Sequence, residues 1–264
     1  FTLFNEKMQF NSPAFEAKIT ALLEKQNNLL VILNTPAHNP TGYTVTDAEW
    51  DGIIDILKTA AKNPGKKITV VIDIAYLDFS GERNACRKFF SKLGQMPPNL
   101  LFIVGFSMSK SFTMYGQRVG AMIGVTSDAD VAKEFEDINQ YSNRATWSNI
   151  NRGVMRMMAM ICADKDLYAQ VEKERDGYYQ LIKGRADIFA AEAAAVNLSM
   201  LPYSAGYFLS VPSTNPDAVV AKLNEENVFA VALAKGIRVA VCAVPTENIK
   251  GMAGKIKISM DSVK

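Results

Sequence analysis

Apolar runs of strand length alternate with helical patterns through the first half of the chain. The runs lie at residues 29–33, 68–72, 100–106 and 121–125, and helical spacing is found after residue 46, near 83–93 and over 128–140. The run 68–72 is entirely β-branched, which is typical of a strand covered on both faces. This alternation predicts an α/β domain with a largely parallel sheet and helices on its faces.

One helix start has a specific signature. Thr46 and Glu49 have the spacing of a capping box, and Trp50, Ile53 and Leu57 follow at helical spacing. We therefore expect an amphipathic helix to begin directly after Thr46.

The second half of the chain has a different pattern. Residues 149–195 are helical in character with few breakers, which predicts two or more helices. Short strands are expected near 207–211 and 237–242, with helices over 216–226 and after Pro245. We interpret residues 1–150 as a large domain, and residues 151–264 as an interdomain helix followed by a small α+β domain.

Composition narrows the classes of function. The 264 residues carry a formal net charge of +2 and are 48% hydrophobic, which suffices for a core and gives no electrostatic footprint for nucleic acid or a membrane. With three dispersed cysteines and one histidine, neither a zinc site nor a disulfide framework is expected. The start of the chain does not have the pattern of a signal peptide. These features predict a cytoplasmic protein without a metal.

Lys110 is the first candidate for chemistry. It lies in Ser107-Met108-Ser109-Lys110, directly after the apolar run 100–106. A desolvated lysine near a second cation is a nucleophile towards carbonyls, as a Schiff base requires. From this segment alone, an ordinary solvated loop lysine is the alternative.

Two other segments place polar residues after predicted strands. Asp73 ends the run 68–72 and Tyr76 follows it, at the position where open α/β sheets contact ligands, although a turn aspartate explains Asp73 equally well. His38-Asn39-Pro40-Thr41-Gly42 follows the run 29–33; a turn explains its proline and glycine but not Asn39. We expect His38 to be structural or a stacking residue.

Three motifs in this order, Ala-His-Asn-Pro-Thr-Gly, Asp-x-Ala-Tyr and Ser-x-x-Lys followed by Arg-Val-Gly, make the chain resemble the fold-type I pyridoxal-phosphate enzymes. Within them it is similar to the class I aspartate/aromatic (tyrosine) aminotransferases. The resemblance implies a three-layer sandwich with a mainly parallel sheet, a smaller α+β domain, and pyridoxal 5′-phosphate as the cofactor.

The resemblance also implies roles for the cofactor site. Lys110 would be the Schiff-base lysine and would shuttle the proton between the substrate Cα and the cofactor C4′ atom. Asp73 would keep the pyridine nitrogen protonated, so that the ring acts as an electron sink. The other cofactor ligands it implies are Asn39 and Tyr76 at the ring 3-oxygen, and Ser107 and Arg118 at the phosphate.

For the substrate, the resemblance implies two arginines. Arg238 would bind the α-carboxylate with its guanidinium fork, Asn39 would also contact the substrate, and Phe208 would line the small-domain side of the substrate pocket. A rival alignment would place Lys257 there, but a lysine lacks the fork. Arg144 would reach the neighbouring subunit's site and bind the distal carboxylate of an acidic substrate, which implies a homodimer.

The family's N-terminal portion, with its glycine-rich phosphate loop, has no counterpart in this sequence. We therefore expect this chain alone to bind pyridoxal phosphate weakly or not at all and to be weakly active or inactive. The predicted reaction is transamination of an acidic or aromatic L-amino acid with a 2-oxo acid such as 2-oxoglutarate. Two alternatives stay open: a β-lyase or cyclase using the same cofactor, and the effector-sensing domain of a transcription regulator.

Overall fold

The computed structural model describes residues 1–263, which form two compact units. Unit 1 consists of residues 1–35, 45–78 and 82–172, and unit 2 of residues 36–44, 79–81 and 173–264. The short segment 36–44 therefore belongs to unit 2, although its neighbours along the chain belong to unit 1. The predicted boundary at residue 150 separates a cofactor-binding large domain from an interdomain helix and a small domain. This division stays a prediction.

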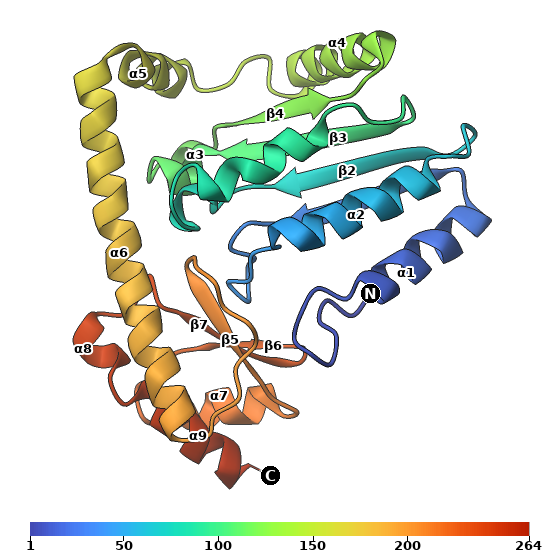
Figure 1. Ribbon diagram of the computed structural model, residues 1–264. Helices are drawn as coiled ribbons and strands as arrows, with labels where there is room; N and C mark the ends of the chain where they lie inside the picture. The colour runs from blue at the N-terminus through green and yellow to red at the C-terminus, as the bar shows by residue number, and fades with distance from the viewer. Residues whose placement is uncertain (264) are drawn as a thin grey trace. The chain divides into compact units, whose positions relative to one another are not determined.

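The elements of unit 1 follow the predicted alternation (Figure 1). They are α1 (Ser12–Lys25), β1 (Asn28–Asn34), α2 (Asp47–Ala60), β2 (Lys67–Asp73), η2 (Ala85–Leu93), β3 (Leu100–Ser107), α3 (Met108–Ser111), η3 (Tyr115–Gln117), β4 (Gly120–Val125), α4 (Ala129–Thr146) and α5 (Arg152–Ala163). The short helix η1 (Leu77–Phe79) and the long helix α6 (Lys165–Ala195) each include residues of both units.

The sheet of unit 1 has the order β1-β2-β3-β4. The strands β1, β2 and β3 are parallel, and β4 is antiparallel to β3. The predicted largely parallel sheet is confirmed, with an antiparallel strand at one edge. The connection over 108–119 forms the short helices α3 and η3 and returns the chain antiparallel to β3.

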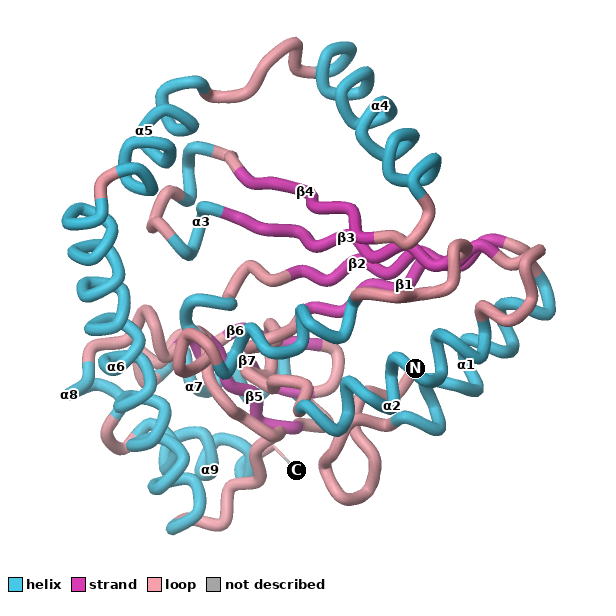
Figure 2. The backbone as a smooth tube through the Cα atoms, turned by 45° about the horizontal axis from the view of Figure 1, so that its top comes forward, coloured by secondary structure: helices cyan, strands magenta, loops and turns pink. Residues whose placement is uncertain are grey.

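The side chains on the two faces of this sheet differ in burial. In β1, Leu29, Val31 and Leu33 are buried, whereas Leu30 and Ile32 on the opposite face are 60% and 66% exposed. The helices α1 and α2 lie along one side of the sheet (Figure 2). The helix α4 packs near β4, where Phe135 occupies the space that a side chain on Gly124 would need.

Local signals explain one helix well and another poorly. The capping box of α2 forms as predicted, because Thr46 Oγ1 accepts from the Glu49 amide and Glu49 accepts from the Thr46 amide. The helix predicted near 83–93 is a 3-10 helix, η2, instead of an α-helix. Its N-cap, Asn84, makes no side-chain cap bond, and its position is fixed by packing, since the Phe89 ring stacks on Trp50 with centroids 5.0 Å apart.

Unit 2 is built on a second, antiparallel sheet of order β5-β7-β6. Its elements are β5 (Phe208–Pro212), α7 (Pro216–Glu225), β6 (Val231–Leu233), β7 (Gly236–Ala240), α8 (Thr246–Ile249) and α9 (Met252–Ser262), with the second part of α6. The core contains Phe189, Leu209, Leu223, Ile237 and Ile256, all buried. The small α+β unit agrees with the predicted pattern, although β6 was not predicted.

Within residues 1–263, none of the helices combines the length and apolar character needed to cross a membrane.

Candidate active site

The connection from β3 to β4 holds three of the predicted residues. Ser107 ends β3 and caps α3, where its hydroxyl accepts from the Ser109 amide at 3.2 Å. A small cluster of Met108, Val119 and Val154 packs beneath this turn, and Phe112 and Met114 join it from the side. This anchoring fixes the backbone that carries Lys110 and Arg118.

Arg118 turns back onto its own loop. Its backbone is left-handed, with φ 56°, and Nη1 donates to Ser109 Oγ at 3.2 Å and to the Tyr115 carbonyl at 2.9 Å. Ser107, Ser109 and Arg118 thereby gather two hydroxyls and a guanidinium on one connection. Such a donor set is suited to a phosphate group.

Lys110 is partly buried in α3 and lies among aromatic rings. Its Nζ is 4.2 Å from the centroid of the Tyr115 ring and 5.9 Å from that of Tyr76. Arg118 Cζ is 5.6 Å from the same Tyr115 ring, so that ring contacts both cations.

Asp73 ends β2 in the expected position. Its carboxylate accepts from the Ala75 amide at 3.0 Å, and its register neighbours are Asn34 on β1 and Gly105 on β3. Tyr76 follows as a buried residue. Asp73, Tyr76 and Lys110 therefore lie in one unit, near the carboxyl ends of neighbouring parallel strands.

The segment 36–44 is held within unit 2 by many hydrogen bonds. The Gly42 carbonyl accepts from the amides of Ser204 and Ala205 at 2.8 and 3.1 Å, and the Pro40 carbonyl accepts from Ser210 Oγ at 2.8 Å. Gly42 has φ +73°, and a Cβ there would lie 2.2 Å from the Tyr203 ring. Only glycine fits this close approach, which explains the glycine of the motif.

Asn39 and Arg238 meet within unit 2. Arg238 lies on β7 and donates through Nη1 to Asn39 Oδ1 at 3.1 Å. Its guanidinium carbon lies 4.3 Å from the centroid of the Phe208 ring. Arg238 Nε is buried, and among the described residues no acceptor bonds to it. A buried donor without a hydrogen-bond partner is energetically unfavourable.

His38 has a structural setting, as expected. Its Nδ1 lies 2.9 Å from Thr41 Oγ1, and burial lowers the pKa of the imidazole below its ordinary value of 6.5. His38 is thus favoured in the neutral form, and it braces the loop that carries Asn39.

The two remaining candidates lie on helix surfaces. Arg144 is exposed in the last turn of α4 and donates to Ser148 Oγ at 2.6 Å. Lys257 lies on α9 and pairs with Asp261 one turn away at 2.8 Å. Lys257 is therefore engaged on a helix, whereas Arg238 lies on a strand beside Asn39 and Phe208.

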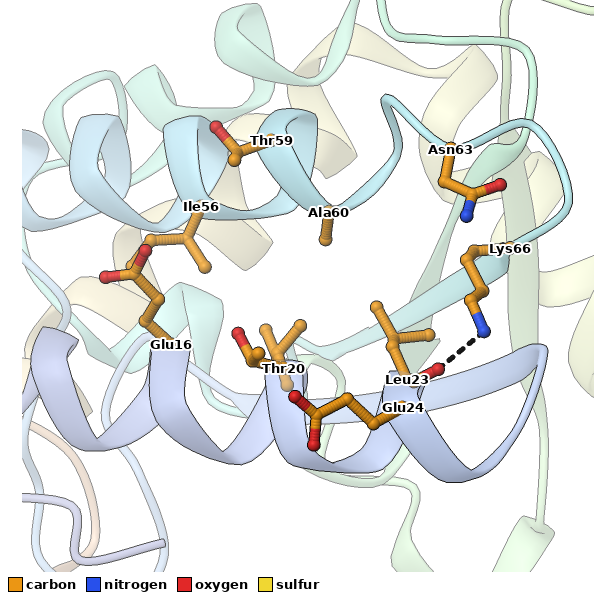
Figure 3. A pocket seen from close by; sticks show the side chains of 10 residues that line it. Glu16, Thr20, Leu23, Glu24, Ile56, Thr59, Ala60, Asn63 and Lys66 are labelled. Carbon is orange, nitrogen blue, oxygen red and sulfur yellow. Dashed lines mark hydrogen bonds between the residues drawn. The ribbon is translucent and has the colours of Figure 1, made fainter.

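Two hollows of unit 1 are lined by other residues. A groove of about 410 Å³ lies between α1 and α2, with Ile19, Leu23 and Ile56 in its lining and Glu16 and Glu24 projecting from α1 (Figure 3). A second hollow, also about 410 Å³, lies between β4 and α4 and includes Met122 and Trp147. None of the predicted site residues lines either hollow.

Ser109 and Tyr115 are contacts that the sequence analysis did not single out. Ser109 could have been noticed as the second hydroxyl of Ser-x-Ser-Lys, one residue before Lys110. Tyr115 gives no comparable signal, because its place beside both cations depends on how the connection folds.

Comparisons with known proteins identify the family of this chain. The family described as aminotransferase class I and II matches residues 4–256. An aspartate aminotransferase of Pseudomonas aeruginosa is 28% identical over 240 residues, which cover 87% of this chain and 56% of that protein. The chain thus spans little more than half the length of this relative.

Solved structures show the same fold. The crystal structure of an aminotransferase from Anaerococcus prevotii superposes with a TM-score of 0.96 at 35% identity, covering 98% of this chain and 63% of that one. An aromatic-amino-acid aminotransferase from Burkholderia pseudomallei, covalently bound to pyridoxal phosphate, gives 0.78 at 24% identity, covering 97% and 61%. The predicted α/β fold is therefore confirmed, and this chain belongs to the class I and II aminotransferase family.

Proposed function

We propose that this chain carries the lysine-bearing part of a pyridoxal-phosphate-dependent aminotransferase. The observation that carries the proposal is the connection from β3 to β4, which gathers Lys110, Ser107, Ser109 and Arg118 in a chain of this family. The reaction that we propose is transfer of the amino group of an acidic or aromatic L-amino acid to a 2-oxo acid such as 2-oxoglutarate.

The residues of unit 1 fit the chemistry of this cofactor. Ser107 and Ser109 offer hydroxyls and Arg118 a guanidinium for the phosphate, and Asp73 offers a carboxylate for a protonated ring nitrogen. When bound, pyridoxal phosphate supplies an electron sink for the negative charge that develops at the substrate Cα.

The proposed roles of Tyr76 and Lys110 follow from the chemistry of their side chains. The Tyr76 phenol would donate a hydrogen bond to the ring 3-oxygen. Lys110 would hold the cofactor through its amine, and the free amine would serve as the base that moves the proton at the substrate Cα. A lysine amine on a short helix just after a strand can do both, because its long stem allows the amine to move.

Arg238 supplies the substrate carboxylate site of unit 2. The Phe208 ring and the Asn39 amide hold the guanidinium in a fixed plane, with Nε buried and lacking an acceptor among residues 1–263. A carboxylate accepting from this edge of the guanidinium would satisfy Nε and add a charge-assisted pair. Asn39 is thus assigned to orient Arg238.

Arg144 supports a homodimer. It is exposed at the end of α4, where Ile138, Tyr141 and Trp147 are 55%, 80% and 76% exposed. Several large apolar side chains exposed on one segment mark a surface suited to contact with another protein. We propose that a second copy covers this surface and that Arg144 then binds the distal carboxylate of an acidic substrate in the partner's site.

The experiment is transfer of ¹⁵N from labelled L-aspartate or L-tyrosine to 2-oxoglutarate at saturating pyridoxal phosphate, followed by mass spectrometry of glutamate. Because the chain spans less than two thirds of the length of its relatives, we expect the amino transfer to be slow. It should exceed the rate with free pyridoxal phosphate, and Lys110→Ala should return it to that background. A Lys110→Ala variant that keeps the wild type's excess over this background would contradict the proposal.

A further inference from the structure

Tyr115 is not part of the cluster of Met108, Val119 and Val154 that anchors its loop. It begins η3, between Thr113 and Arg118, whose backbones are both left-handed with φ 53° and 56°. The neighbouring Met114 packs into the small cluster beneath the turn, whereas Tyr115 is 65% exposed. The Tyr115 ring therefore does not contribute to this cluster.

The ring faces two cations. Lys110 Nζ and Arg118 Cζ lie 4.2 and 5.6 Å from its centroid, both within the range of a cation–π interaction. Two positive groups on one loop repel each other, and the electron-rich face of the ring offsets part of this repulsion. Arg118 is also fixed by the Tyr115 carbonyl, while the flexible Lys110 stem gains a definite resting position from the ring.

We propose that Tyr115 is a positioning residue, whose ring face holds the Lys110 ammonium beside Arg118 until the amine is used. This inference deepens the proposed function and rests on it for its meaning, although the contact itself is a property of the chain without cofactor. The aromatic ring, and not the phenol hydroxyl, is the group that acts. Removing the ring should release the ammonium, so that the amine loses its proton more readily and attacks carbonyl carbon faster.

The test measures acetylation of Lys110 by trace acetic anhydride at one pH, without cofactor, relative to other lysines of the same sample by mass spectrometry. Tyr115→Leu should label Lys110 about two- to fivefold faster, the range of an exposed cation–π contact. Tyr115→Phe should match the wild type, and Tyr115→Trp, with the stronger ring, should label more slowly. The control Tyr178→Leu, another exposed tyrosine, should change nothing.

Some outcomes would overturn the proposal. Equal rates in the wild type and the Leu and Trp variants would show that the ring does not hold the amine. A Phe variant as fast as the Leu variant would assign the effect to the hydroxyl. Because Trp is expected to act in the opposite direction, loss of folding in one variant cannot imitate the predicted series. Labelling without cofactor also separates this proposal from the proposed function, which the amino-transfer assay tests.

Discussion

Two strands differ in their surroundings: β7 in unit 2, which contains Arg238, and β4 in unit 1, which begins two residues after Arg118. In β7, Gly236, Ile237 and Val239 are buried, and Arg238 stacks on Phe208. Along β4, Gly120 to Ile123 are exposed, and Arg118 is held by a loop carbonyl and an exposed ring. The arginine proposed to bind the carboxylate is thus surrounded by residues of its own unit, whereas the arginine proposed to bind the phosphate lies beside an exposed strand.

The largest effect that sharpens this comparison is on stability. Ile237 on β7 is fully buried, and Ile123 on β4 is 53% exposed. We expect Ile237→Ala to lower the free energy of unfolding by about 2–5 kcal/mol, because it removes core packing. The matched Ile123→Ala change should lower it by less than about 1 kcal/mol.

Urea unfolding followed by circular dichroism measures both variants, and hydrogen exchange of the β5 and β7 amides shows whether the loss lies in unit 2. Equal losses in the two variants would show that β4 is packed as firmly as β7 in solution.

The second effect concerns the carboxylate. Arg238→Lys keeps the charge but loses the fork, and we expect it to weaken 2-oxoglutarate binding by about ten- to a hundredfold. Titration calorimetry measures the affinity, with Arg83→Lys as the control, since Arg83 pairs with Glu172 in unit 1. If the two variants bind 2-oxoglutarate equally well, Arg238 does not bind the carboxylate.

The smallest expected effect is the contribution of His38 to the pH dependence of the unfolding free energy. Its pKa is lowered in the folded chain, so the unfolded chain binds more protons as the pH falls below about 6.5. The wild type should therefore lose stability on acidification, and His38→Gln should lose less between pH 7.5 and 5. Urea midpoints across this range measure the difference; parallel curves would contradict a partly buried, neutral imidazole.

The sequence predicted those strands and helix ends that depend on interactions between neighbouring residues. Apolar runs gave β1, β2, β3 and β4, and Thr46 with Glu49 marked the start of α2. The antiparallel direction of β4 and the short strand β6 depend on how the chain returns to a sheet, which no short pattern encodes.

The candidate site likewise has residues that the sequence could indicate and contacts that it could not. Lys110, Asp73 and Arg238 could be proposed from ordered motifs and a family resemblance, and their assignments stay predictions. Contacts between distant residues could not be predicted. Asn39 is joined to Arg238 across much of the chain, and Tyr115 meets Lys110 only because α3 and η3 fold back together.

The central claim is that Lys110 is the lysine that holds the cofactor. The most direct measurement is incubation of the chain with saturating pyridoxal phosphate, reduction with borohydride and peptide mapping of the phosphopyridoxyl mass. We predict that Lys110 carries more label than any other lysine and that Arg118→Ala or excess inorganic phosphate reduces this label selectively. Label spread evenly over the exposed lysines, unchanged by phosphate, would contradict the account.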